Sequence, residues 1–335
     1  MFIINSYTLA VVFCFITMLC WGSWGNTQKL AGKTWRYELF YWDYVIGMVI
    51  FTLLLGFTMG SIGTEGRSFV ADLGKAELKS IGWVILGGVI FNASNILLSA
   101  STSLAGLAVA FPLGCGLALV LGVINNYLEQ AKGNPVLLGL GVLLVVVAIV
   151  CNGMAAGRVA KGSEQNSGRN KGIILAIVAG LLMSTFYRFV VKGMDIDNFV
   201  SPEVGKLTPY SAIFIFSVGV LLSNFVFNTL VMKKPFVGEP VSYSDYFKGS
   251  FKTHLVGILG GMIWCLGTAF SYIAAGKAGA AVSYALGQGA PMIAAFWGVF
   301  IWKEFKGADK KTNLLLGLMF LLFIAGLATI VVAGN

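Results

Sequence analysis

The sequence predicts an all-α polytopic membrane protein with ten transmembrane helices, arranged as two inverted repeats of five helices each. Apolar residues make up 57% of the 335 residues and charged residues only 11%, a composition unlike that of soluble globular proteins. Stretches of 18 to 24 residues are nearly free of charge, which is enough to cross a hydrocarbon core of about 30 Å. Residues 87–118 also reappear, shifted by 173 positions and without a gap, at 260–291.

The repeat sets the expected domain organisation. Glycines recur across the shift, as in the pairs Gly88/Gly261 and Gly106/Gly279, and Phe111 is matched by Tyr284. Each half holds five apolar spans, and an odd number of crossings makes the second copy enter the membrane from the opposite side. We therefore divide the chain into a first repeat at 1–156, a polar cytoplasmic linker at 157–171 and a second repeat at 172–335.

Windows of about 20 apolar residues place the spans in order along the chain. The first follows six residues without Lys or Arg and runs on to Trp21, so it is read as a retained helix and not as a cleaved signal peptide. Leu, Ala and Gly dominate the other spans, which favours helices over the alternating strands of a barrel. Pro112 and Pro291 lie within the fourth and ninth spans and are expected to kink them. The expected spans are 7–25, 40–60, 81–100, 104–127, 136–156, 172–192, 208–232, 254–274, 278–301 and 313–333.

Lys and Arg gather on one side of this topology. The loops after spans 1, 5, 7 and 9 hold 15 of the 23 basic residues, the opposite loops hold 7, and Arg188 is the remaining one. Because basic loops stay in the cytoplasm, both termini are expected to face out of it. The net charge of +9 is thereby explained by topology and by attraction to the lipid bilayer, and no nucleic-acid partner is expected.

Catalytic, cofactor and metal sites are not indicated. All five cysteines lie within spans, which fits neither a disulfide framework nor a zinc site. Gly32-Lys33-Thr34 resembles the end of a phosphate-binding loop, but Thr27 stands where that loop needs its first glycine. We therefore expect no cofactor, no metal and no enzymatic activity.

Two ionisable residues stand within spans, where charge is costly and therefore a functional candidate. Asp43 lies one turn into the second span, where it could bind a proton or contact substrate, or could simply be favoured by the helix N-terminus among interfacial aromatics. Arg188, beside Tyr187 in the sixth span, could contact substrate or could extend to the outer interface. His254, at the start of the eighth span, is read as interfacial, with a proton relay as the alternative.

Neutral polar and aromatic residues near the middle of the spans are the expected ligand contacts. Amide, hydroxyl and indole groups over aromatic faces suit a small uncharged solute that forms hydrogen bonds, although bonds between helices would use the same groups. Asn95 and Thr268 are equivalent under the shift of 173, so they could face each other across a pseudo-two-fold axis. The neutral candidates are Asn92, Asn95, Phe111, Tyr187, Trp264, Thr268, Tyr284 and Gln288, and Arg188 is the charged one.

The sequence resembles the drug/metabolite transporter superfamily, and in detail its ureide permease branch. Residues 87–95, 105–109 and 122–128, the last ending in Asn126-Tyr127-Leu128, are similar to spans 3 and 4 of that branch. Gly22-Ser23-Trp24 resembles its glycine-x-tryptophan signature, and Trp42-Asp43-Tyr44 its aspartate-tyrosine pair.

The resemblance implies uptake of allantoin, uracil or a related heterocycle with protons, or of a monosaccharide as in adjoining branches. It adds Trp24 as a substrate contact and Tyr41 and Tyr44, beside Asp43, as proton-coupling or substrate residues. The favoured hypothesis is a proton-coupled importer in the cell membrane. A multidrug or metabolite exporter of the same superfamily, and a membrane enzyme or structural subunit, are the alternatives. An exporter of lipophilic cations calls for an acidic residue deep in the cavity, and Asp43 is the one candidate.

Overall fold

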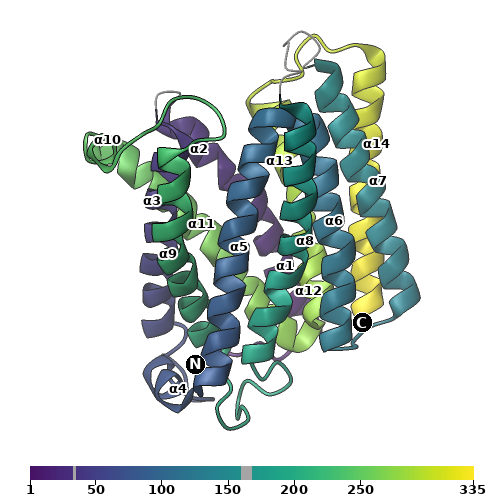
Figure 1. Ribbon diagram of the computed structural model, residues 1–335. Coiled ribbons are helices and arrows are strands. Elements are labelled where there is room, and N and C mark those ends of the chain that lie inside the picture. Colours follow the sequence, from purple (N-terminus) through teal and green to yellow (C-terminus); the bar gives the residue numbers. More distant parts are fainter. Residues whose placement is uncertain (33–34, 160–167) are drawn as a thin grey trace.

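The computed structural model describes residues 1–32, 35–159 and 168–335, apart from the side chains of Leu107, Ala108 and Phe111. In this part the chain forms a bundle of long helices (Figure 1), and ten of them are long and apolar enough to cross a membrane, as predicted. The first span consists of α1 (Tyr7–Ser23) and α2 (Gly25–Ala31), and the ninth consists of α12 (Ala280–Gly287), α13 (Ala290–Phe296) and the π-helix η1 (Trp297–Ile301). Each of the other spans is a single helix. In chain order these are α3 (Tyr37–Phe57), α5 (Leu78–Ala105), α6 (Leu107–Glu129), α7 (Pro135–Val159), α8 (Arg169–Gly193), α9 (Pro209–Lys233), α11 (Phe251–Ala278) and α14 (Lys310–Gly334).

Two short helices outside the spans were not predicted. α4 (Phe69–Lys75) precedes α5, and α10 (Tyr243–Phe247) lies between α9 and α11. The start of α10 is stabilised by a capping box, in which Ser242 and Asp245 each hydrogen-bond the backbone N–H of the other. The expected linker at 157–171 is helical at its two ends, and its middle, 160–167, lies outside the described residues.

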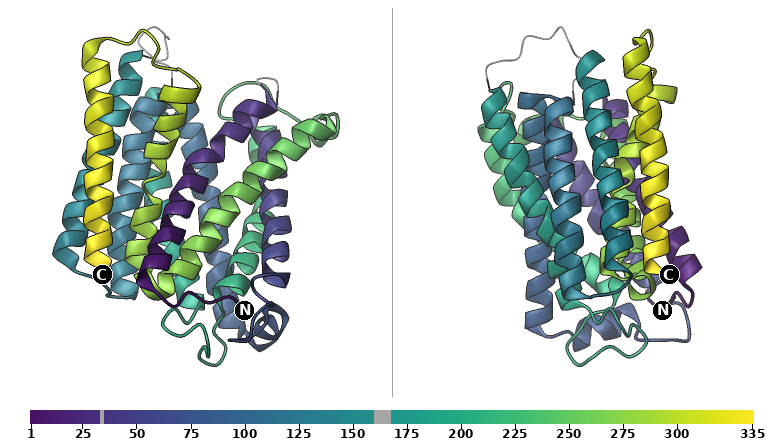
Figure 2. Two further views of the ribbon diagram at one scale, coloured as in Figure 1. Left: turned by 180° about the vertical axis from the view of Figure 1, so that it is seen from behind. Right: turned by 90° about the vertical axis from the view of Figure 1, so that its right-hand side faces the viewer.

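Both chain termini lie at the same end of the bundle, which we call the terminal face (Figure 1). At the opposite end, which we call the basic face, lie the ends of α2, α7, α9 and η1, which precede the loops richest in Lys and Arg. Two views turned by 90° and 180° show the same separation, with α10 projecting from the basic face (Figure 2). The assignment of these faces to the two sides of a membrane stays a prediction.

The third span of each half packs against helices of the other half. α5 packs against α8 and α9, and its equivalent in the second half, α11, packs against α1 and α3. Glycines allow this contact: a Cβ atom on Gly88 would lie 2.4 Å from the carbonyl oxygen of Phe216, and one on the equivalent Gly261 would lie 1.8 Å from that of Tyr44. Only a residue without a side chain fits at either crossing. The inverted relation of the two halves itself stays a prediction.

A tight turn at glycine follows the third span of each half. Gly106 joins α5 to α6 with φ +78° and ψ 156°, and Gly279 joins α11 to α12 with φ +85° and ψ 151°. Residues with a side chain rarely adopt this backbone conformation. The two turns are equivalent under the shift of 173, but α5 ends at the basic face and α11 at the terminal face (Figure 1).

The ninth span is interrupted near its middle. α12 ends at Gly287 and α13 starts at Ala290, with Pro291 in its first turn, because proline lacks the N–H that would continue the helix. Pro112, by contrast, lies inside the continuous helix α6. The break places Gln288 between two helical segments, where its side chain is half-buried.

We expect Gly261→Ala to destabilise the protein, because the new methyl group would overlap the backbone of α3 at Tyr44. Overpacking of this kind costs about 1–3 kcal/mol. Gly82→Ala, on the repeat-equivalent helix α5, is the matched control, since nothing lies within 4 Å of its new methyl group. The measurement is the temperature at which the detergent-solubilised protein loses its monodisperse elution peak. A Gly261→Ala variant as heat-resistant as Gly82→Ala would contradict the packing described here.

Candidate substrate-binding site

A cavity of about 170 Å³ lies between the two halves. Three helices of the first half and three spans of the second half line it, and these are the equivalents of one another under the repeat. The lining residues are Trp21 and Trp24 of the first span, Phe91, Asn95 and Leu98 of α5, Gly114, Cys115 and Ala118 of α6, Ala179, Gly180, Met183 and Phe186 of α8, Trp264 of α11, and Gln288, Ala290, Pro291 and Ala294 of the ninth span.

Aromatic rings form one wall of the cavity. The rings of Trp21 and Trp264 are stacked with their centroids 6.1 Å apart and an interplanar angle of 12°. The ring centroid of Phe91 lies 4.4 Å from that of Trp264, and the ring centroid of Tyr44 lies 4.9 Å from that of Trp24. Flat apolar faces of this kind suit the rings of a heterocycle or the C–H faces of a sugar.

Neutral polar groups provide the hydrogen-bonding capacity. No charged side chain is among the lining residues of the described chain. The side chain of Gln288 and the indole N–H of Trp264 are not hydrogen-bonded to any described residue, so both are available to a ligand. Asn95 uses its amide nitrogen to donate to the hydroxyl of Tyr41 at 3.2 Å, and its carbonyl oxygen has no partner among the described residues. These groups match an uncharged, hydrogen-bonding solute.

Tightly packed polar and aromatic side chains close the cavity toward the terminal face. The hydroxyl of Tyr187 lies 3.0 Å from that of Ser271, and Ser271 lies 2.9 Å from Ser283, which links α8, α11 and α12. Tyr284 donates to the carbonyl oxygen of Ala118 on α6 at 3.1 Å. Tyr187, Ser271, Ser283 and Tyr284 are fully buried. Solute therefore has no path on this side in the present conformation.

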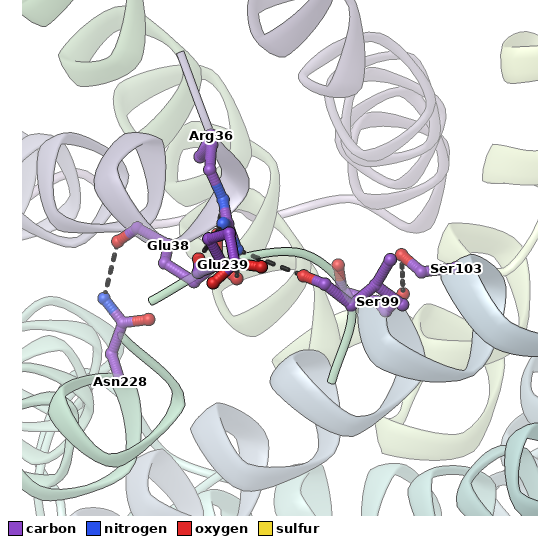
Figure 3. A network of polar contacts seen from close by, with 7 residues as sticks. Arg36, Glu38, Ser99, Ser103, Asn228 and Glu239 are labelled. Carbon is purple, nitrogen blue, oxygen red and sulfur yellow. Dashed lines mark hydrogen bonds and ion pairs between the residues drawn. The ribbon is translucent and has the colours of Figure 1, made fainter. Parts of the chain in front are cut away.

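α5 reaches the protein surface in its last turn, at the basic face. Thr102 is half-buried and Ser103 is exposed, whereas Phe91 and Asn92 are buried. Ser99 and Ser103 lie beside an ionic network at the start of α3 (Figure 3).

Arg36 holds the segment between α9 and α10 at the basic face (Figure 3). Its guanidinium group pairs with the carboxylate of Glu38 at 2.7 Å and donates to the carbonyl oxygens of Val237 and Glu239. Asn228 of α9 donates to the backbone carbonyl of Glu38 at 2.8 Å. These bonds tie the start of α3 to the connection that follows α9.

Asp43 lies outside the cavity, near the basic face. Its carboxylate is fully buried, with one oxygen 2.7 Å from Nδ1 of His254 on α11 and 2.6 Å from the hydroxyl of Tyr246 on α10. The other oxygen has no hydrogen-bond partner among the described residues. The ring of Trp35 packs edge-on against His254 at 5.2 Å. Asp43, Tyr246 and His254 thus connect α3, α10 and α11 at this end of the bundle.

The remaining predicted residues lie at the edges of the site. Arg188 pairs with Glu129 at the end of α6, with 2.7 Å between Nε and Oε2, and the two are partly exposed near the terminal face. Thr268 is buried and accepts a hydrogen bond of 2.9 Å from the indole N–H of Trp21, which does line the cavity. Phe111 lies in α6, but its side chain lies outside the described residues.

Several residues of the site were not singled out from the sequence. Trp21, Met183 and Phe186 line the cavity, and Tyr246 binds Asp43. His254, which was considered from the sequence, also binds Asp43, and this contact was not predicted. The spacing of Trp21 and Trp24 places two indoles on neighbouring positions of one helix face, which is a usable signal. The contact between Tyr246 and Asp43 spans 203 residues of sequence and leaves no local pattern.

Within the described ranges no group of three or more His, Cys, Asp or Glu side chains could hold a metal ion. Cys115 is the cysteine that lines the cavity. The site therefore offers hydrogen bonding and aromatic contact.

Comparison with curated proteins finds permeases and uptake proteins. The chain is 23% identical to ureide permease 2 of Arabidopsis thaliana over 397 aligned residues, which cover 100% of this chain and 99% of that protein. It is 21% identical to ureide permease 1 of the same plant, with the same coverage. A probable glucose uptake protein of Staphylococcus aureus is 22% identical over 229 residues, which cover 67% of this chain and 69% of that protein.

A crystal structure of another protein shares the fold. It superposes with a TM-score of 0.62 over 97% of this chain and 96% of that one, at 16% sequence identity. The sequence model of the ureide permease family matches residues 40–170 and 157–333. The resemblance noted in the sequence is thereby confirmed over most of the chain, and the relatives are transporters and not enzymes. The chain belongs to the ureide permease family of integral membrane transporters.

Proposed function

We propose that this protein imports a small uncharged polar metabolite, a ureide or nucleobase such as allantoin or uracil, or a monosaccharide, by proton symport with alternating access. The observation that carries the proposal is the cavity between the two halves, which combines stacked aromatic rings with free amide and indole groups and has no charged side chain in its described lining. Neutral solutes with several hydrogen-bonding groups fit such a site.

The names of the relatives support both solute classes. Ureide permeases match the whole chain, and the glucose uptake protein matches two thirds of it. Export of lipophilic cations, the alternative within the superfamily, finds less support, because Asp43 does not line the cavity and no other described acidic side chain does. A cation in this cavity would meet aromatic faces and neutral carbonyl oxygens, and no negative charge among the described lining residues.

Alternating access would follow from the packing of each half against the other, because the two halves can change their relative conformation. In this proposal the cavity opens at the basic face while the buried side chains described above close it toward the terminal face. An inverted repeat can reach the opposite arrangement when each half takes up the conformation of the other. With the basic face in the cytoplasm and both termini outside the cell, this conformation would face inward. The closure at Tyr187, Ser271 and Ser283 would open in the other state.

Asp43 is the proposed proton-binding residue. Burial, together with the hydrogen bond to Asp43 and the negative charge of that carboxylate, raises the pKa of Tyr246 above its ordinary value, so the phenol keeps its proton and donates it in the hydrogen bond. Protonation of Asp43 would weaken its bonds to Tyr246 and His254 and loosen α10 and α11 from α3. Asp43 also packs directly on Gly257, two turns from Trp264 in the cavity, so α11 would carry the change to the substrate.

Proteoliposomes that contain the protein should accumulate labelled allantoin, uracil or a monosaccharide when an inward proton gradient is imposed. The gradient drives the solute because both move in the same direction, so a protonophore should abolish accumulation. The measurement is the internal label over time, with protein-free liposomes as the control. Transport of tetraphenylphosphonium without transport of any neutral solute would contradict the proposal and favour the exporter.

Asp43→Asn should uncouple the transporter. The amide keeps the shape of the carboxylate and still accepts a hydrogen bond from Tyr246, but it cannot bind a proton. We expect proton-driven accumulation to be lost while exchange of labelled for unlabelled solute continues.

Asp245→Asn is the matched control, because this acid belongs to the same helix as Tyr246 but is exposed and pairs with Lys248 at the surface. It should leave accumulation unchanged. Unaltered proton dependence in the Asp43→Asn variant would exclude Asp43 as the coupling residue.

A further inference from the structure

A chain of four hydrogen-bonded side chains leads from α9 to the cavity. Asn92 Nδ2 donates to Ser223 Oγ at 2.9 Å, Tyr41 Oη donates to Asn92 Oδ1 at 2.9 Å, and Asn95 Nδ2 donates to Tyr41 Oη at 3.2 Å. We call these four residues the Asn95 relay. Asn95 alone among them lines the cavity, and the other three are buried behind it.

The backbone fixes the direction of every bond in the Asn95 relay. The carbonyl oxygen of Val220 lies 3.3 Å from one end of the Asn92 amide, and a carbonyl only accepts, so that end must be the nitrogen. The oxygen of Asn92 then faces Tyr41, and the single phenolic proton of Tyr41 must point to it. Tyr41 can therefore only accept from Asn95, which places the amide nitrogen of Asn95 toward Tyr41.

The consequence lies in the cavity. With its nitrogen bound to Tyr41, the Asn95 amide has a carbonyl oxygen that no described residue occupies. We propose that Tyr41, Asn92 and Ser223 are positioning residues that hold this oxygen as a hydrogen-bond acceptor, so that the site selects solutes that present an N–H or O–H donor to Asn95. This inference rests on the proposed function, because it concerns how the same cavity chooses its substrate.

The relay is held rigidly enough to act in this way. The ring of Tyr41 is stacked between those of Tyr37 and Tyr44, with centroids 5.2 and 5.4 Å away. Tyr41 and Asn92 have no exposed surface. Rotation of the Asn95 amide would set two acceptor oxygens against each other at Tyr41, because the hydroxyl proton of Tyr41 is already committed to Asn92, unless the whole relay reversed against the carbonyl of Val220.

Tyr41→Phe tests the proposal. It removes the hydroxyl but keeps the stacked ring, so the Asn95 amide can turn over and offer either its oxygen or its nitrogen. The full-length protein in detergent is titrated by calorimetry with two pairs of probes: uracil and 1,3-dimethyluracil, and glucose and 3-O-methylglucose. The second member of each pair has one or more donors blocked by methyl groups. The quantity of interest is the ratio of the two dissociation constants within a pair.

The wild-type protein should bind the unblocked member of at least one pair about tenfold more tightly, the value of one hydrogen bond. In Tyr41→Phe this ratio should fall to about threefold or less. The steric effect of the methyl groups is the same in both proteins and cancels in the comparison. Tyr37→Phe is the matched control: it removes a hydroxyl from the same aromatic stack, at an oxygen without a described hydrogen-bond partner, and should keep the wild-type ratio.

Asn92→Leu is the second variant, because it frees the Tyr41 proton to point at Asn95 and should lower the ratio as well. If the wild-type protein binds none of the four probes, this inference fails, and the proposed function fails with it only if allantoin does not bind either. If the wild-type protein binds the two members of each pair equally well, the Asn95 relay has no part in selection. The same conclusion follows if Tyr41→Phe and Asn92→Leu both elute as folded protein and both keep the wild-type ratio. In either case the proposed function stands.

Discussion

The rest of this structure depends on the close crossing of the third span of each half with the second span of the other half. Gly88 and Gly261 leave no space for a side chain there, because a Cβ atom would overlap the backbone of the opposite helix. The positions three, four and seven residues after each of these glycines lie on the same helical face as the glycine. In α5 these positions are Phe91, Asn92 and Asn95, and in α11 they are Trp264, Cys265 and Thr268. The crossing that joins the halves therefore also directs aromatic and polar side chains into the centre of the bundle.

A bilayer core provides no water, so polar groups in the spans need partners inside the protein. This constraint separates the polar residues of the site into two sets. Asn92, Thr268, Ser271 and Ser283 are engaged with other helices, whereas Gln288 and one end of Asn95 face the cavity. The buried carboxylate of Asp43 is bound by His254 and Tyr246 at the basic face, away from the neutral cavity. Solute recognition and proton binding would thus be separate in space and linked through α11.

The ten spans could be predicted because apolar length is a local property, and the break at Pro291 follows from the chemistry of proline. The turns at Gly106 and Gly279 were not predicted and fall inside the expected spans 104–127 and 278–301, because glycine is also common within transmembrane helices. The short helices α4 and α10 could not, because their sequences are too short to show a period. Trp24, Asn95, Trp264 and Gln288 were predicted as ligand contacts and line the cavity, although no ligand contact has been tested. The partners of Asp43 and Arg188 were missed, since contacts over 203, 211 and 59 residues of sequence depend on how the helices pack.

The central claim is that one cavity between the halves is open at the basic face, closed at the terminal face and filled by the solute. Cys115 lines that cavity, and the other four cysteines are buried, so labelling of Cys115 by an impermeant thiol reagent tests the claim most directly. With the basic face in the cytoplasm, we predict labelling in inverted membrane vesicles, little labelling in intact cells, and protection by the transported solute, with Cys115→Ala as the blank. Equal labelling from both sides without protection by any solute would contradict the account.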